Sequence, residues 1–180
     1  MSHLKTISIG GFKSIFDQRI DLGRLNVFIG TNGAGKSNLL EAIAMLSSSI
    51  EGGIDYERLS RRGARLSSPQ IFRSAFKNKP RKNTILLEAT TDKLAYRMSV
   101  NAVEGFSYNA ESLKKNGKTK NLCGRSNKGA TIKGKKINKL DRTKSIIPIY
   151  RSFDSTGHDL LMIEKFSIYA PSTPILRGVA

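Results

Sequence analysis

The residues with the clearest chemical potential lie between Gly30 and Ser37. Their sequence, Gly-Thr-Asn-Gly-Ala-Gly-Lys-Ser, satisfies the P-loop pattern G-x-x-x-x-G-K-[ST] at every fixed position. Glycines at positions 33 and 35 allow positive φ, so that successive backbone N–H groups can converge on phosphate oxygens. Lys36 would reach the β- and γ-phosphates, and Ser37 would place its hydroxyl on Mg²⁺. The pattern therefore predicts a site for a magnesium nucleoside triphosphate.

The elements on either side of this loop supply the context that the pattern requires. Residues 25–29 are an apolar run of strand length, directly before Gly30. A helical pattern begins at Ser37, with apolar residues spaced to form one packing face: Leu39, Ile43, Leu46 and Ile50. The start of that helix would add a partial positive charge aimed at the phosphates. A glycine-rich turn that matches the pattern by accident is the alternative.

Length and composition indicate one globular domain over residues 1–180. A chain of 180 residues with 38% hydrophobic content can form a single core. Because Cys123 is the only cysteine, neither an internal disulfide nor a C-x-x-C metal pair can form. The sequence has no apolar run of roughly 18 residues and no apolar leader at its start. We therefore expect a cytoplasmic protein that makes no contact with a membrane.

The positive charge is large and unevenly distributed. Net charge is +17, from 31 basic and 14 acidic residues. Residues 58–82 contain nine Lys or Arg and no Asp or Glu, and residues 114–144 contain twelve against Asp141 alone. Such segments suit a polyanion, because each phosphate that Lys or Arg neutralises releases a condensed counterion. A solvated basic loop, or a loop that meets an acidic partner, is the alternative.

Residues 113–144 are poor in apolar side chains and rich in Lys, Asn and Gly. Low hydrophobicity with high charge predicts a long loop or a flexible insertion in the domain. Aromatic residues are absent between Tyr108 and Tyr150, so base stacking has no candidate there. If this segment meets DNA, we expect it to contact phosphate and not to read sequence.

The remaining pattern is that of short strands. Residues 3–9 and 19–22 read as a small antiparallel sheet that leads into the strand at 25–29, and residues 84–90 and 93–100 read as a hairpin with a third strand opening near Phe106. Apolar character returns at residues 145–150 and 159–164, and residues 166–171 read as a further strand.

The N-terminal pattern resembles a known family. Gly11-Phe12-Lys13-Ser14 between two short strands, followed by the loop and helix over residues 29–43, is similar to the N-terminal lobe of RecF/SMC-like, ABC-type ATPases. It resembles in particular the AAA-family ATPases related to the OLD nucleases, which are often found in anti-phage systems. The likeness is specific over the first fifty residues. It implies an α/β P-loop NTPase fold, with an antiparallel subsheet beside a central strand, P-loop and helix.

The resemblance also implies which residues bind ATP and Mg²⁺. Most nucleotide contacts would come from the loop and the first helical turn, namely Gly30, Asn32, Gly33, Ala34, Gly35, Lys36, Ser37 and Asn38. Lys13 would lie near the nucleotide, and Gln70, with Ser37, would contact the metal. A surface lysine in a turn and a solvated glutamine in a loop are the alternatives for residues 13 and 70.

Two parts that this family needs for hydrolysis are missing from the pattern. The sequence contains no Leu-Ser-Gly-Gly signature, and the apolar run at 159–164 ends in Glu164 and Lys165 in place of a carboxylate pair. Without a carboxylate to orient water, we expect the P-loop to bind ATP better than it hydrolyses it, and no catalytic residue is assigned. The chain therefore looks like the N-terminal part of a larger ATPase, either truncated or completed by a second polypeptide that supplies the C-terminal lobe. The resemblance implies a homodimer or such a complementing C-terminal lobe, and a role in DNA repair or phage defence.

A second hypothesis gives the basic segments the main role. The chain would then be a nucleic-acid-binding module with a vestigial P-loop, and its affinity for DNA would fall steeply with salt. Both readings can hold together, because one domain can bind ATP and DNA on different faces.

Overall fold

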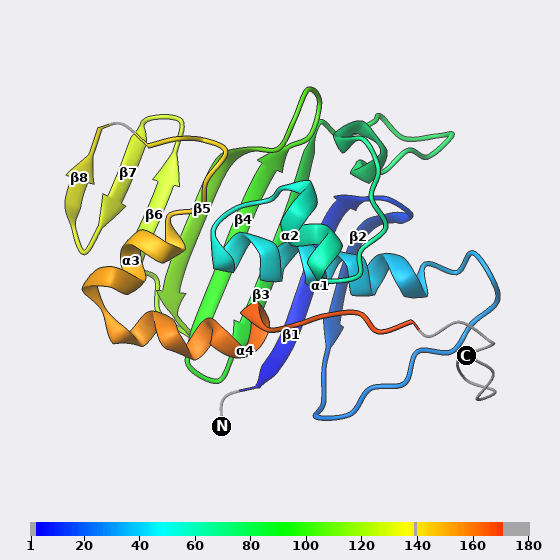
Figure 1. Cartoon of the computed structure of the whole chain (residues 1–180), viewed down its shortest axis with the longest axis horizontal. Coiled ribbons are helices and arrows are strands. Elements are labelled where there is room, and N and C mark those ends of the chain that lie inside the picture. The colour runs from blue at the N-terminus through cyan, green and yellow to red at the C-terminus, as the bar shows by residue number, and fades with distance from the viewer. Residues whose placement is uncertain (1–2, 139, 171–180) are drawn as a thin grey trace.

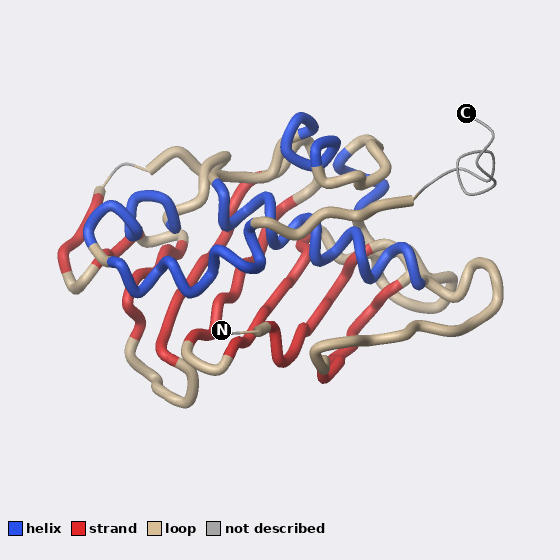
Figure 2. Tube along the Cα trace, turned by 60° about the horizontal axis from the view of Figure 1, so that its bottom comes forward, coloured by secondary structure: helices blue, strands red, loops and turns tan. Residues whose placement is uncertain are grey.

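The computed structural model describes residues 3–138 and 140–170. One eight-stranded antiparallel sheet forms a layer, and the helices lie on one of its faces (Figures 1 and 2). The strand order is β2-β1-β3-β4-β5-β6-β7-β8, so that β2 and β8 are the two edges. The segment between β2 and α1 lies at the β2 end of the sheet, and β8 lies at the opposite end of the molecule (Figure 1).

The strands are joined mostly by short turns. Their bounds are β1 Leu4–Phe12, β2 Ile15–Asp21, β3 Thr84–Thr91, β4 Leu94–Asn101, β5 Ser107–Lys115, β6 Asn121–Ser126, β7 Gly129–Ile132 and β8 Lys135–Ile137. The helices are α1 Lys36–Glu51, α2 Tyr56–Arg61, α3 Ile147–Phe153 and α4 Leu161–Glu164, with 3₁₀-helices η1 Pro69–Phe72 and η2 Ser155–Leu160.

Alternation along the central strands sets which sheet face is buried. In β3 and β4, three cross-strand pairs point toward the helices: Ile85 with Val100, Leu87 with Met98, and Ala89 with Tyr96. The residues between them are half-buried or exposed on the other face. Because the side-chain period of a strand is two, this register places one apolar face under the helical layer. These strands confirm the hairpin expected over residues 84–100.

Helix α1 is the main element above that face. Eleven of its sixteen residues are buried, and they include all four that the sequence placed on its packing face. Its last turns also bury three serines, which are bonded rather than left unpaired: Ser47 Oγ donates to Glu164 O at 2.6 Å, and Ser48 Oγ donates to Gly53 O at 2.6 Å. The expected helix is therefore confirmed, and these serines bond its last turns to neighbouring segments.

Three expectations about secondary structure are wrong, and the third concerns residues 166–170, which are described below. Residues 25–29 form no strand, and the chain between β2 and α1 runs outside the sheet edge (Figure 1). An apolar run becomes a buried strand only where a neighbouring strand pairs with it, and the described residues supply none here. Residues 113–144, expected as a loop or flexible insertion, instead contain the end of β5 and all of β6, β7 and β8.

The β6 to β8 strands form despite their low hydrophobicity because few inward positions need to be apolar. Cys123 and Ile132 are paired across β6 and β7 and are both buried, and Leu113 pairs with Cys123 from β5. Lysines at positions 135 and 136 lie on the terminal strand. Charged side chains on an edge strand prevent pairing with further chains, which explains why this edge is so basic.

The C-terminal part of the described chain is also less regular than expected. Residues 145–150 lead into α3, and residues 159–164 contain the end of η2 and all of α4. Residues 166–170 form no strand, contrary to the expectation, although Ile168 N–H donates to Arg62 O at 2.8 Å. Residue 171 lies outside the described residues.

A buried polar network joins the sheet to the end of α1. The Glu111 carboxylate accepts from Tyr96 Oη at 2.7 Å, Ile146 N at 3.0 Å and Arg125 Nε at 3.1 Å, and also from the Ser145 hydroxyl. The Arg125 side chain is 4% exposed and the Glu111 side chain is fully buried. A buried ion pair is stable only when every partner is satisfied, so this network depends on both charges.

We expect Glu111→Gln to lower the free energy of unfolding by about 3 kcal/mol or more, because it leaves the Arg125 guanidinium buried without a carboxylate. Urea unfolding followed by circular dichroism measures the change. Glu88→Gln, on the half-exposed outer face of β3, is the matched control and should change stability by less than about 0.5 kcal/mol. Equal, small effects of both substitutions would contradict the role of the network.

Candidate functional site

The loop before α1 has a backbone that only glycine tolerates at two places. Gly33 has φ 85° and Gly35 has φ 91°, both in the left-handed region. A Cβ at Gly35 would also lie 2.8 Å from Ser14 Oγ, in the turn between β1 and β2. Gly35 is the N-cap of α1, so the loop turns sharply into the helix at this residue. The two glycines therefore set the curvature of the loop.

The same curvature leaves backbone donors free. Among the described residues, none accepts a hydrogen bond from the N–H groups of Gly33, Gly35, Lys36 or Ser37, whereas Ala34 N–H donates to Thr31 O at 3.2 Å. The first N–H groups of any helix lack partners within the helix, and the positive end of the helix dipole is at this terminus. Free N–H groups at the start of a helix are the kind of donor that binds anions such as phosphate.

Lys36 lies at the start of α1 and stabilises the loop. Its ammonium donates to Gly30 O at 2.7 Å and to Thr31 O at 2.8 Å. These two bonds bring the positive charge back over the start of the loop. The residue that the sequence assigned to phosphate contact is therefore held at the mouth of the loop by the loop's own carbonyls.

A cavity of about 850 Å³ opens beside the loop. Its walls come from β2, from the segment before the loop, from the first turn of α1 and from the chain after η1, and include Phe16, Gln18, Val27, Phe28, Lys36 and Phe76. The rings of Phe16 and Phe76 meet edge to face with centroids 5.7 Å apart. Lys79 Nζ lies 4.0 Å from the centroid of Phe16. The cavity thus combines an apolar aromatic wall with a basic loop mouth, which suits an aromatic base joined to phosphates.

Several of these lining residues could not be assigned from the sequence. Phe16 comes from the edge strand, Phe76 and Lys79 come from an irregular segment, and none belongs to a recognisable pattern. Ser14 also lines the cavity, and its Oγ accepts from Asn38 Nδ2 at 2.7 Å. The Gly-Phe-Lys-Ser segment at residues 11–14 could have indicated Ser14, but the sequence analysis assigned a nucleotide contact only to Lys13 of this segment.

Lys13 is half-buried and does not line the cavity. Its side chain is 11% exposed, and its Nζ donates to Glu41 Oε2 at 2.6 Å. The ammonium also lies 4.4 Å from the ring centroid of Phe72. The backbone has φ 46°, and Lys13 N–H donates to Phe72 O at 2.8 Å. In this structure Lys13 fixes the β1–β2 turn against η1 and α1.

Glu41 is the centre of that arrangement. It lies one turn after Ser37 on α1, with a side chain that is 3% exposed, and it also accepts from Arg65 Nε at 2.7 Å. Burial alone would raise the pKa of Glu41, but hydrogen bonds from Arg65 and Lys13 outweigh burial and hold the pKa below its ordinary value of 4.5. Arg65 reaches on to Asn38 Oδ1 at 3.2 Å, which connects the cluster to the first turn of α1.

The two residues assigned to the metal are placed differently. Ser37 is exposed in the first turn of α1, and its hydroxyl has no hydrogen-bond partner within the described residues. Gln70 lies in η1, where its backbone O accepts from Arg81 Nη2 at 2.6 Å, and it is not among the residues that line the cavity. The structure therefore brings Ser37, but not Gln70, to the free N–H groups at the start of α1.

Over residues 3–138 and 140–170, no group of three or more His, Cys, Asp or Glu is arranged to hold a metal ion. In the same part of the chain, every helix is too short or too polar to cross a membrane.

Comparisons with known proteins give the family and the fold of this chain. A family model described as an AAA domain matches residues 6–166. A solved structure from work on "ATP-driven dimerization and DNA stimulated activation of SMC ATPases" superposes with a TM-score of 0.54 and 16% identity, over 98% of this chain and 90% of that chain. No curated protein matches the sequence. The structural likeness establishes a shared fold, an open antiparallel sheet with helices on one face.

Glu41 should make folding sensitive to acid. Because its pKa is lower in the folded chain, the unfolded chain binds more protons near pH 4.5, and stability falls as pH decreases through the folded pKa. We expect Glu41→Gln to lose about 3 kcal/mol at pH 7 and to depend less on pH than the wild type between pH 5 and 3. Urea unfolding at each pH measures both. Glu57→Gln, on the exposed face of α2, is the control, and a pH profile of Glu41→Gln that matches the wild type would contradict the assignment.

Proposed function

This chain belongs to the AAA domain family, and we propose that it binds Mg²⁺-ATP in the cavity beside the loop at residues 30–37. The observation that carries the proposal is the set of backbone N–H groups at the start of α1 that have no acceptor among the described residues. The first N–H groups of a helix have no partner within the helix and lie at the positive end of its dipole, so a curved row of them can bind an anion.

Each residue at the loop then has a stated part. The N–H groups of Gly33, Gly35 and Lys36 would bind oxygens of the β-phosphate, and the Lys36 ammonium would exchange the carbonyls of Gly30 and Thr31 for phosphate oxygens. The free hydroxyl of Ser37 fits a magnesium ligand. When bound, Mg²⁺ neutralises charge on the phosphates. Phe16 and Phe76 would contact the base on the apolar wall.

Isothermal titration calorimetry with Mg²⁺-ATP tests the site. We expect Lys36→Ala to weaken binding by about 10- to 100-fold, since a charge-assisted hydrogen bond contributes about 1.5–3 kcal/mol. Lys77→Ala, an exposed lysine that does not line the cavity, should leave the affinity unchanged within about twofold. Titration with GTP measures base preference, and undiminished ATP binding by Lys36→Ala would overturn the proposal.

The segment before the loop supports a second part of the proposal, which concerns a partner. Leu25, Val27 and Ile29 are 87%, 75% and 92% exposed although they are alternate apolar residues in a run of strand length. An exposed apolar run of this kind is a site at which a strand of another chain can pair. We propose that a strand of a complementing lobe, or of a second copy in a homodimer, covers residues 25–29. The SMC structure belongs to work on ATP-driven dimerization, which agrees with this proposal.

The substitution Leu25→Asp, at a residue of the run that does not line the nucleotide cavity, should separate folding from association. The side chain is 87% exposed, so we expect the free energy of unfolding to change by less than about 0.5 kcal/mol. We also expect any self-association with Mg²⁺-ATP in sedimentation velocity to be abolished while the affinity for Mg²⁺-ATP is kept. Ile43→Asp, at a position that is 6% exposed on α1, is the contrast and should unfold the chain. Self-association that persists in Leu25→Asp, or a large loss of its stability, would contradict the proposed partner surface.

A nucleic-acid role is the second candidate function, and the charge of +17 favours it. We propose that the ATPase fold acts on DNA in the cytoplasm, in repair or phage defence, with basic surface residues in contact with phosphate. Binding of DNA by a chain that fails to bind Mg²⁺-ATP would favour the alternative in which the P-loop is vestigial.

A further inference from the structure

A lysine-lined hollow lies at the end of the sheet that carries β6, β7 and β8. We propose that this hollow holds the phosphate backbone of a nucleic-acid duplex. The proposal rests on the suggested role at nucleic acid, and it does not depend on ATP binding at the P-loop. It assigns the contact with nucleic acid to one site within residues 114–144, which the sequence alone marked only as a basic segment.

Two adjacent turns build the hollow, whose volume is about 470 Å³. The β5–β6 turn contains Gly117 at φ 73°, and Lys118 N–H donates to Lys115 O at 3.0 Å. In the β7–β8 turn Lys133 has φ 48°, and its N–H donates to Leu122 O at 2.9 Å. This bond ties the second turn to β6. The four lysines that line the hollow come from these turns and so have fixed backbones: Lys115, Lys118, Lys120 and Lys133.

The charge inside the hollow is not balanced. Asp154 is the one carboxylate residue among those that line it, and Lys133 Nζ lies 2.9 Å from Asp154 Oδ2 and donates to Phe153 O at 3.0 Å. Hydrogen bonds from Thr156 and Lys133 hold the pKa of Asp154 well below its usual range, so this carboxylate stays ionised and offsets Lys133. Lys115, Lys118 and Lys120 are exposed and have no acidic partner among the described residues.

The shape and lining favour a duplex backbone over other anions. The phosphates of a duplex project from its surface and can enter a hollow. A flat anionic membrane would contact only the residues at the rim of the hollow, and the protein would need apolar residues there to insert into the membrane. The lining residues include no aromatic ring, so the hollow offers no platform for the bases of a single strand. Contacts made by lysine alone recognise phosphate and not sequence.

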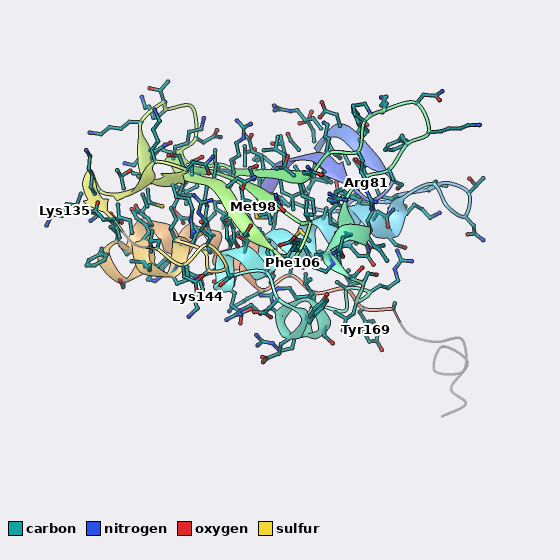
Figure 3. All side chains as sticks on the ribbon, turned by 90° about the horizontal axis from the view of Figure 1, so that it is seen from above. Arg81, Met98, Phe106, Lys135, Lys144 and Tyr169 are labelled. Atoms are coloured by element: carbon teal, nitrogen blue, oxygen red, sulfur yellow. The ribbon has the colours of Figure 1, made fainter. Side chains whose placement is uncertain are left out.

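The hollow is well separated from the nucleotide cavity. The strand order places β6 to β8 at the edge opposite β2, which contributes to that cavity. Figure 3 shows Lys135, on β8, and Arg81, in the other basic segment, at opposite ends of the molecule. A duplex at the hollow therefore leaves the P-loop open, and basic residues near β2 provide a control set of equal charge.

The experiment measures binding of a fluorescent, random-sequence DNA duplex by anisotropy between 50 and 200 mM salt, without nucleotide. We expect the triple substitution Lys115→Gln, Lys118→Gln and Lys120→Gln to weaken binding at least about tenfold. It should also reduce the slope of log K against log salt by about 2.7, at about 0.9 for each phosphate that is no longer neutralised. The matched control replaces three exposed cations near β2 (Arg19→Gln, Arg24→Gln and Lys77→Gln) and should change affinity less than about threefold.

Other results of the same measurements would overturn the proposal. Equal losses in the two triple variants would show a general charge effect and overturn the hollow as the site. Tighter binding of a single strand than of a duplex, or equal binding to vesicles of anionic lipid, would also overturn it. Lys36→Ala should bind duplex as the wild type does, and the hollow variant should bind Mg²⁺-ATP as the wild type does. Failure of ATP binding alone would thus leave this inference standing.

Discussion

The packing of α1 against one face of the sheet is the constraint on which the other features depend. Its buried residues cover the inward side chains of β1 and β3, while its N-terminus extends toward the β2 edge. There Gly35 has a positive φ, and a Cβ on it would lie 2.8 Å from Ser14 Oγ in the β1–β2 turn. The free N–H groups that could hold phosphate are therefore positioned by hydrophobic burial along the rest of the helix together with the curvature of the loop.

Much of this could be read from the sequence because local patterns were sufficient. The spacing of Leu39, Ile43, Leu46 and Ile50 predicts the buried face of α1, and alternation in residues 84–100 predicts the β3–β4 hairpin. The loop residues at 33, 35 and 36 were also identifiable, since positive φ and a converging lysine require those residue types. In each case a short window contains all of the information that decides the conformation.

The rest depended on contacts between distant segments. The run at 25–29 has the composition of a strand, but a strand also needs a neighbour, and that information lies outside the window. Residues 113–144 read as a loop because only alternate inward positions, such as Cys123 and Ile132, need to be apolar in a strand with one wet face. The sequence left Lys13 either near the nucleotide or on the surface, and its bond to Glu41, 28 residues away, is a contact that no local pattern predicts. Long-range pairing decides each of these, and no local propensity reveals it.

A chain of buried hydrogen bonds connects the end of α1 to the basic end of the sheet. At the far end of α1 from the loop, Ser49 Oγ bonds to Tyr96 Oη at 2.5 Å and to Tyr108 Oη at 2.6 Å. Tyr96 bonds to Glu111, and Glu111 holds Arg125 on β6, which donates to Asp141 O at 3.1 Å. The chain of contacts is buried and fully hydrogen-bonded, so it resists distortion more than a surface contact would. This network therefore fixes the end of α1 against β4, β5 and β6, and it connects the helix to the basic end of the sheet through buried side chains.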